Sequence, residues 1–136
     1  MDTESKHSVR IRGKTTGSVT SNVISLAGRN VMQVEIGAGE TKSIKPIDGE
    51  NLAAAAKIAH EQGIPIVCFV ESSGADILEG VAAVHGWGVA AREFVRCSGK
   101  VPIIFCVTGA TVSGPALLLG LADFVVMVDD SYAFVS

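Results

Sequence analysis

Residues 103–123 read IIFCVTGATVSGPALLLGLAD, and this stretch decides the fold. Its first five residues form a continuous apolar run, which is typical of a strand buried in a parallel sheet. Gly109 and Gly114 then allow the chain to turn, and Pro115 suits the first position of a helix that continues through the Ala and Leu residues. The stretch therefore predicts a strand, a turn between the two glycines, and a helix.

The turn before this helix offers backbone N–H groups rather than reactive side chains. Aligned peptide dipoles make a helix N-terminus favourable for negative charge, so the amides of Ser113 and Gly114 could hold an anion or an oxyanion. Thr111 and Ser113 carry unactivated hydroxyls, and their neighbours are apolar or glycine. Any chemistry at this turn is therefore expected to depend mainly on backbone amides.

A second stretch repeats the pattern. Residues 66–70, IVCFV, predict another buried strand, and residues 71–75, ESSGA, form a second glycine-containing turn. Carboxyl ends of parallel strands lie at the same edge of a sheet, so the amides of Gly74 and Ala75 could converge with those of Ser113 and Gly114 on one oxygen atom. That arrangement would be an oxyanion hole. The simpler alternative is that both turns only need glycine to change direction.

The remaining elements place these two turns in an α/β domain. Residues 23–26 and 31–36 predict a hairpin with a turn at 27–30. A helix is expected from Asp48 as N-cap to Gly63, before Pro65. The next helix should end at Gly99 and bury one face, formed by Val84, Trp87, Ala91, Phe94 and Val95. The order, a hairpin followed by alternating helices and strands, indicates parallel strands. We expect residues 1–18 to be a mobile polar arm and residues 19–136 to be the domain.

Composition limits the classes of function. The 136 residues have a net charge of −3 and no large basic cluster, which argues against a nucleic-acid surface. No signal peptide and no membrane-spanning run is expected, and no metal-ligand spacing is present. Three cysteines in apolar or helical stretches suggest reduced thiols and a cytoplasmic protein. With 48% hydrophobic residues, the chain is expected to bury an apolar face against a partner or a further segment.

Three segments resemble one enzyme family. Residues 71–80, ESSGADILEG, resemble the D-S-G-G-A-R-I-Q-E-G signature of the biotin-dependent acyl-CoA carboxyltransferases, the β subunits of propionyl-CoA and related carboxylases. Residues 109–124 are similar to their G-P-C-A-G-G-A-V-Y-S-P-A-L-T-D-F segment. Residues 98–102 resemble the S-G-V-I-P that precedes it. The order and spacing hold through Ser136, and weaker similarity reaches back to the hairpin.

The resemblance implies a crotonase-like spiral of ββα units, of which this chain would supply an incomplete N-terminal half. It implies that the amides of Ser113 and Gly114 hold the thioester oxygen of an acyl-CoA as an enolate; Gly74 and Ala75 match a turn that supplies a second amide in the wider superfamily. The enolate carbon would then take a carboxyl group from carboxybiotin on a partner carrier domain. The implied partners are a complementary C-terminal carboxyltransferase domain or subunit and a biotin carboxylase or carrier component, in a homo-oligomer, so this chain alone should be inactive.

Two alternatives remain open. Ser73 and Asp76 stand where the family has Gly and Arg, and Ser113 replaces a glycine, which favours a non-catalytic scaffold or assembly subunit of the same fold. Residues 73–77 also resemble the A-G-A-D-I turn of enoyl-CoA hydratases and isomerases. Those enzymes need a carboxylate to move a proton, whereas the corresponding position here is Leu117. His60 and His85 lie far from both turns in sequence and are expected to be surface or packing residues.

Overall fold

The computed structural model describes residues 9–10 and 17–135. In chain order its elements are β1 (Val9–Arg10), β2 (Val19–Leu26), β3 (Arg29–Ile36), β4 (Ser43–Ile44), α1 (Pro46–Gln62), β5 (Ile66–Ser72), β6 (Gly74–Ala75), the 3₁₀ turn η1 (Ile77–Glu79), α2 (Val81–Cys97), β7 (Ile103–Val112), α3 (Gly114–Leu118), the 3₁₀ turn η2 (Leu119–Leu121), β8 (Phe124–Met127) and β9 (Tyr132–Phe134). Most of the arm expected at residues 1–18 lies outside the described residues. Val9–Arg10 pairs with β2, and Ser18 is buried.

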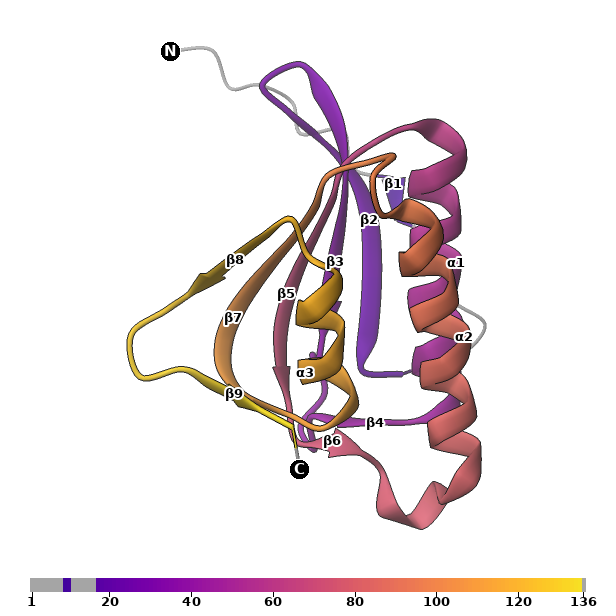
Figure 1. Cartoon of the computed structure of the whole chain (residues 1–136), viewed down its shortest axis with the longest axis vertical. Coiled ribbons are helices and arrows are strands. Elements are labelled where there is room, and N and C mark those ends of the chain that lie inside the picture. The colour runs from indigo at the N-terminus through magenta and orange to yellow at the C-terminus, as the bar shows by residue number, and fades with distance from the viewer. Residues whose placement is uncertain (1–8, 11–16, 136) are drawn as a thin grey trace.

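One mixed sheet organises the domain. Its strand order is β1-β2-β3-β5-β7-β8, and β9 pairs with the far end of β7. The expected hairpin is present as the antiparallel pair β2–β3, while the pairs β3–β5, β5–β7, β7–β8 and β7–β9 are parallel. Because β5 and β7 are parallel neighbours, their carboxyl ends lie at the same edge, the lower edge in Figure 1. The predicted α/β class and parallel strands are therefore confirmed.

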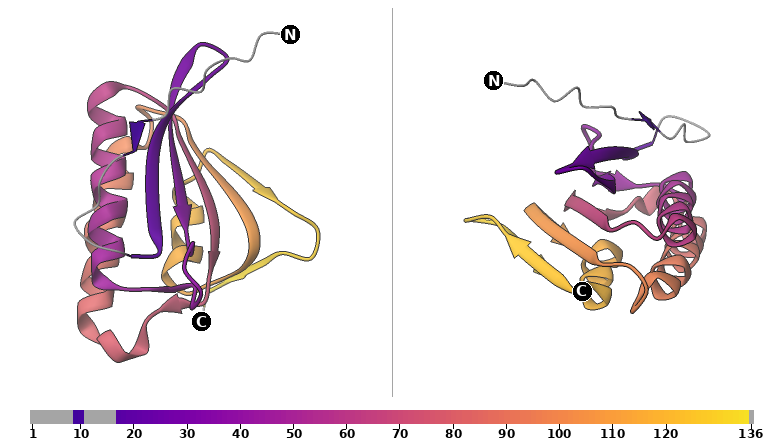
Figure 2. Two further views of the ribbon diagram at one scale, coloured as in Figure 1. Left: turned by 180° about the vertical axis from the view of Figure 1, so that it is seen from behind. Right: turned by 90° about the horizontal axis from the view of Figure 1, so that it is seen from above.

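Within residues 17–135, the helices cover one face of this sheet. α1 and α2 pack side by side on it, and α3 lies beside α2, as the view from above in Figure 2 shows. Inward-facing residues alternate along the strands, with Ile66, Cys68 and Val70 of β5 fully buried. They form the core with apolar residues of the helices, such as Leu52 and Phe94.

The first helix starts three residues earlier than the sequence indicates. The N-cap is Lys45, and Asp48, expected to be the N-cap, occupies the third helical position. Its carboxylate accepts the Lys45 N–H at 2.9 Å, as an acidic residue at that position does in a capping box. It also accepts the N–H of Val19 at 3.0 Å, so it ties α1 to β2. The predicted end is correct, because Gly63 adopts the left-handed conformation with φ 65°.

The second helix buries a slightly different face from the predicted one. Trp87 and Phe94 are buried, as expected, whereas Val84 and Val95 are 65% and 58% exposed. Gly86 takes part in the buried face because α1 crosses α2 there. A β-carbon on Gly49 would lie only 2.4 Å from the Gly86 backbone. Two glycines thus let the helices approach until their backbones touch.

The strand β7 is longer than predicted. It continues through Gly109 to Val112, and the turn is confined to Ser113. Pairing with β9 and with Ser72 of β5 supports this extension. Gly109 is therefore a strand residue rather than a turn residue. Its lack of a side chain matters because a β-carbon there would lie 2.5 Å from Cδ of Glu71.

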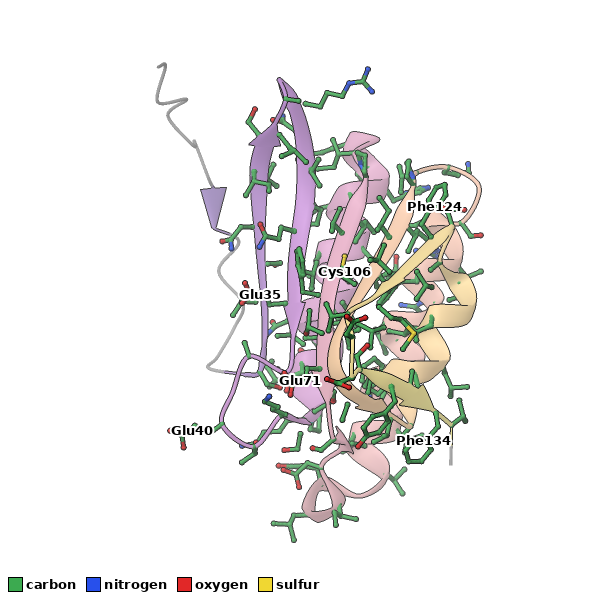
Figure 3. The ribbon with its side chains drawn as sticks, turned by 90° about the vertical axis from the view of Figure 1, so that its left-hand side faces the viewer. Glu35, Glu40, Glu71, Cys106, Phe124 and Phe134 are labelled. Atoms are coloured by element: carbon green, nitrogen blue, oxygen red, sulfur yellow. The ribbon has the colours of Figure 1, made fainter. Side chains whose placement is uncertain are left out.

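The other face of the sheet is open. Figure 3 looks onto it and shows Glu35, Glu71, Cys106 and Phe124 on or beside this face. The strand register places Phe69 and Cys106 side by side, followed by Val126 of β8. Every residue of β8 is exposed. Exposed apolar side chains thus lie along β8 and β9, and a second group lies in η1 and the start of α2, at Ile77, Leu78, Val81 and Val84.

Candidate active site

The two glycine-containing turns come together at the carboxyl edge of the sheet. Val70 is in register with Val107, and Ser72 with Thr111, after a shift in register between them. Beyond these pairs the chain segments touch, since a β-carbon on Gly74 would lie 3.2 Å from Cβ of Ser113. The sequence prediction that the two turns are neighbours is confirmed. Whether they act together on an oxygen atom stays a prediction.

Ser113 holds the turn before α3 in an unusual conformation. Its φ of 61° and ψ of −131° lie in a region that residues other than glycine rarely occupy. Its N–H donates to the carbonyl oxygen of Phe134 in β9 at 3.1 Å. The Ser113 amide, one of the four predicted donors, therefore already has an acceptor inside the chain.

Gly114 follows as the first residue of α3, with Pro115 next to it as predicted. A helix provides no acceptor for the N–H of its first residue, so the Gly114 amide is directed out of the helix end. Leu117, not Gly114, donates to the carbonyl oxygen of Ser113, at 3.2 Å. Among the predicted donors on this side, Gly114 is the one that the helix geometry leaves available.

In the opposite turn, the two predicted donors also differ, because the Gly74 amide has an acceptor within the chain and the Ala75 amide points elsewhere. The Gly74 N–H donates to the hydroxyl of Ser72 at 3.1 Å, and that hydroxyl donates to the carbonyl oxygen of Lys42 at 3.0 Å. The Asp76 N–H donates to Ile44 in β4 at 2.9 Å. Neighbouring N–H groups of an extended chain point in opposite directions, so the Ala75 N–H is directed away from β4.

Trp87 forms the inner wall beside Gly114. A β-carbon on Gly114 would lie 2.9 Å from Nε1 of Trp87 and 3.0 Å from two ring carbons, so the indole ring lies flat against the glycine. The Trp87 Nε1–H is buried and has no acceptor among the described residues. The sequence indicated Trp87 only as part of a core stripe with Phe94. No local pattern relates it to Gly114, because the two residues meet through the packing of α2 on α3.

Two acidic residues near the turns have structural partners. The Asp76 carboxylate accepts the N–H of Leu78 at 3.0 Å and the hydroxyl of Ser43 at 3.3 Å, so it caps η1. Glu71 forms an ion pair with Lys42, and its side chain lies over Gly109. Asp76 is thus the N-cap of η1, whose last residue is Glu79.

The two described histidines and the three cysteines lie outside the two turns in sequence. His85 is exposed on α2, and His60 lines a groove of about 640 Å³ between the carboxyl ends of α1 and α2. All three cysteines are free thiols. Burial raises the pKa of the Cys68 thiol, with smaller contributions from Cys106 and Cys97, so it stays protonated and unreactive. Within the described ranges, no group of three or more potential ligands could hold a metal ion.

No helix among the described residues is both long enough and apolar enough to cross a membrane.

The chain has the fold of its structural neighbours, which are crotonase-fold carboxyltransferases. The chain is a member of the carboxyl transferase domain family, whose model matches residues 7–136. It is 37% identical over 91 residues to the propionyl-CoA carboxylase beta chain of Rhodococcus erythropolis, an alignment covering 66% of this chain and 19% of that protein. It is 28% identical over 120 residues to the methylmalonyl-CoA carboxyltransferase 12S subunit of Propionibacterium freudenreichii, covering 88% of this chain and 22% of that one.

A solved structure supports the fold. One chain of the transcarboxylase 12S structure, a hexamer assembly with hydrolysed methylmalonyl-CoA bound, superimposes on this chain with a TM-score of 0.83. The two are 24% identical, and the superposition covers 99% of this chain and 30% of that chain. The chain thus spans about a fifth of the length of the curated relatives described above. The family resemblance expected from residues 71–80 and 98–124 is confirmed.

Proposed function

We propose that this chain is the acyl-CoA-binding part of a carboxyltransferase that moves a carboxyl group from carboxybiotin to the α-carbon of an acyl-CoA. Membership of the family supports the reaction class. The observation that carries the site is the meeting of the two turns, with Gly114 at the open end of α3. The relatives named above act on propionyl-CoA or methylmalonyl-CoA, so a short acyl thioester is the substrate class we propose.

The proposed chemistry uses backbone donors. Loss of the α-proton places negative charge on the thioester oxygen, and fixed N–H groups stabilise that charge without reorganising. Of the four amides predicted from the sequence, Ser113 and Gly74 donate within the chain. The amides of Gly114 and Ala75 are therefore the proposed donors to the oxygen. Carboxybiotin, held by a partner, supplies the carboxyl group, and no residue of this chain is assigned to bind it.

We infer the partners from the same relationship. A complementary C-terminal carboxyltransferase domain or subunit, a biotin carboxylase or carrier component and a homo-oligomeric assembly are proposed, and the hexamer assembly of transcarboxylase 12S supports the last of these. The cytoplasmic location expected from the reduced thiols stays a prediction.

The test is carboxylation of propionyl-CoA by the assembled enzyme with its biotin components. Gly114→Val should abolish turnover because the added side chain overlaps Trp87 and displaces the amide. Gly120→Val is the matched control, since a β-carbon at Gly120 meets nothing within 4 Å. Normal turnover by Gly114→Val would place the site elsewhere.

A non-catalytic scaffold of the same fold is the second candidate. It is favoured by the internal hydrogen bonds that occupy the amides of Gly74 and Ser113. Binding of propionyl-CoA without turnover in the complete assembly would support it. A hydratase or isomerase gains no such support, because α3 carries no carboxylate and Leu117 is 61% exposed.

A further inference from the structure

Ser113 adopts a conformation for which this chain elsewhere uses glycine. Gly80 precedes α2 with φ 53° and ψ −132°, nearly the same values as the φ 61° and ψ −131° of Ser113 before α3. Glycine enters this region without steric penalty, whereas a β-carbon makes it unfavourable. Residues held in such regions cluster at functional sites, where the surrounding structure maintains them. The serine at position 113 therefore suggests a role for its side chain.

The side chain lies between the two turns. A sharp, strained turn from a strand into a helix presents its side chain at the top of the sheet, as in enzymes that display a serine there. Here β7 leads into α3 through Ser113 alone, and Cβ of Ser113 faces Gly74 of the opposite turn. The side chain is half-buried, so it remains accessible to a small ligand.

Ser113 has two hydrogen-bond donors, its backbone N–H and its hydroxyl, and the hydroxyl is the one available to a ligand. Its backbone N–H donates to Phe134, as described above. Among the described residues, Oγ of Ser113 makes no hydrogen bond. No imidazole or carboxylate of a described residue is hydrogen-bonded to it, and a serine nucleophile needs such a base. The geometry therefore favours a hydrogen-bond donor over a nucleophile.

We propose that Ser113 is a catalytic hydrogen-bond donor whose Oγ–H binds the thioester carbonyl oxygen of the acyl-CoA beside the Gly114 amide. This inference rests on the proposed function. The hydroxyl takes the place that the occupied amide of the same residue cannot fill. No covalent bond to Ser113 forms, and its proton stays on Oγ while charge develops on the thioester oxygen.

Two substitutions in the assembled enzyme separate the hydroxyl from the backbone strain. Ser113→Ala removes the hydroxyl and keeps the strain, whereas Ser113→Gly removes both. If the hydroxyl is a donor, both variants should lose about 100-fold in kcat with propionyl-CoA, the scale of losing one oxyanion donor. Ser113→Gly should nevertheless have a higher Tm than wild type, and Ser113→Ala an unchanged one.

Gly80→Ser is the matched control for strain, because it places a serine in the same conformation at an exposed position. It should lower Tm and leave kcat unchanged. A direct readout is the infrared stretch of propionyl-CoA labelled with ¹³C at the carbonyl. Its frequency should fall on binding to the wild type and fall less in both Ser113 variants.

Three results would overturn the inference. The first is full activity in Ser113→Gly, which would leave the hydroxyl without a role. The second is an acylated Ser113 detected by mass spectrometry, which would make it a nucleophile. The third is a wild-type enzyme that binds no propionyl-CoA, in which case the proposed function fails and the inference fails with it. The first result, seen alongside normal turnover by the wild type, would contradict this inference and leave the proposed function standing.

Discussion

Trp87 contributes both packing and an unsatisfied donor to the wall of the candidate site. Its ring covers Gly114, but its buried Nε1–H has no acceptor among the described residues. A buried donor without a partner costs about 1–3 kcal/mol. Trp87→Phe should remove that cost and lose some packing, so we expect the free energy of unfolding to change by less than about 1 kcal/mol.

The comparison for Trp87 is Phe94→Leu, which also shrinks a buried aromatic side chain of α2 but relieves no polar group. It should lower the free energy of unfolding by roughly 1 kcal/mol or more. Urea denaturation of both variants measures the difference. An equal or larger loss in Trp87→Phe would mean that the indole N–H has an acceptor.

Cys68 makes stability sensitive to alkaline pH. Burial raises the pKa of its thiol above the ordinary value of 9.0, so the folded chain keeps a proton that the unfolded chain loses. The stabilising effect is complete below about pH 9 and is lost as pH rises above it. Denaturation between pH 7 and 10.5 should show the wild type losing stability more steeply than Cys68→Ala. Parallel slopes would contradict this prediction.

At the scale of elements, the close packing of α1 against α2 depends on the pair Gly49 and Gly86. A β-carbon on Gly49 would overlap the backbone of Gly86 at 2.4 Å, and backbone cannot move aside cheaply. Gly49→Ala should therefore destabilise the domain by roughly 2 kcal/mol or more, through overpacking. Gly88→Ala is the control, because it meets nothing within 4 Å and should stabilise α2 by about 1 kcal/mol. Thermal unfolding of the two variants should move Tm in opposite directions.

The sequence predicted elements well where their signals are local. The end of α1 at Gly63 depends on one residue and its neighbours, and the prediction was correct. The start of α1 was wrong by three residues because Asp48 serves a capping box as well from the third helical position as from the N-cap. The end of β7 was also wrong. Its extension to Val112 depends on pairing with residues 132–134, which no local pattern around Gly109 reveals.

For the whole molecule, the sequence predicted which turns meet but not which donors remain. Two continuous apolar strands imply parallel neighbours, and parallel neighbours bring Gly74 and Ser113 to one edge. The acceptor for the Ser113 amide is Phe134, which is 21 residues later and reaches it only through β9. The contact between Trp87 and Gly114 depends on how α2 packs against α3. These features arise from tertiary packing, so they needed the structure.

The whole molecule also presents an apolar edge that should control its association. β8 contains only Phe, Val and Met, and its residues are exposed, with Phe124 at 67% and Val126 at 56%. An exposed, uncharged edge strand is a template for pairing with another chain. We therefore expect the 136-residue chain to self-associate, and Val126→Lys to reduce this by placing a charge on the strand.

Val95→Lys provides the control for charge alone. Val95 is 58% exposed, similar to Val126, but it lies on α2, away from the β8–β9 edge. Sedimentation velocity over a range of concentrations should show both the wild type and Val95→Lys in larger species, and Val126→Lys shifted towards the monomer. If both lysines reduced association equally, net charge would explain the effect. If neither did, the apolar edge would not be the surface through which the chains meet.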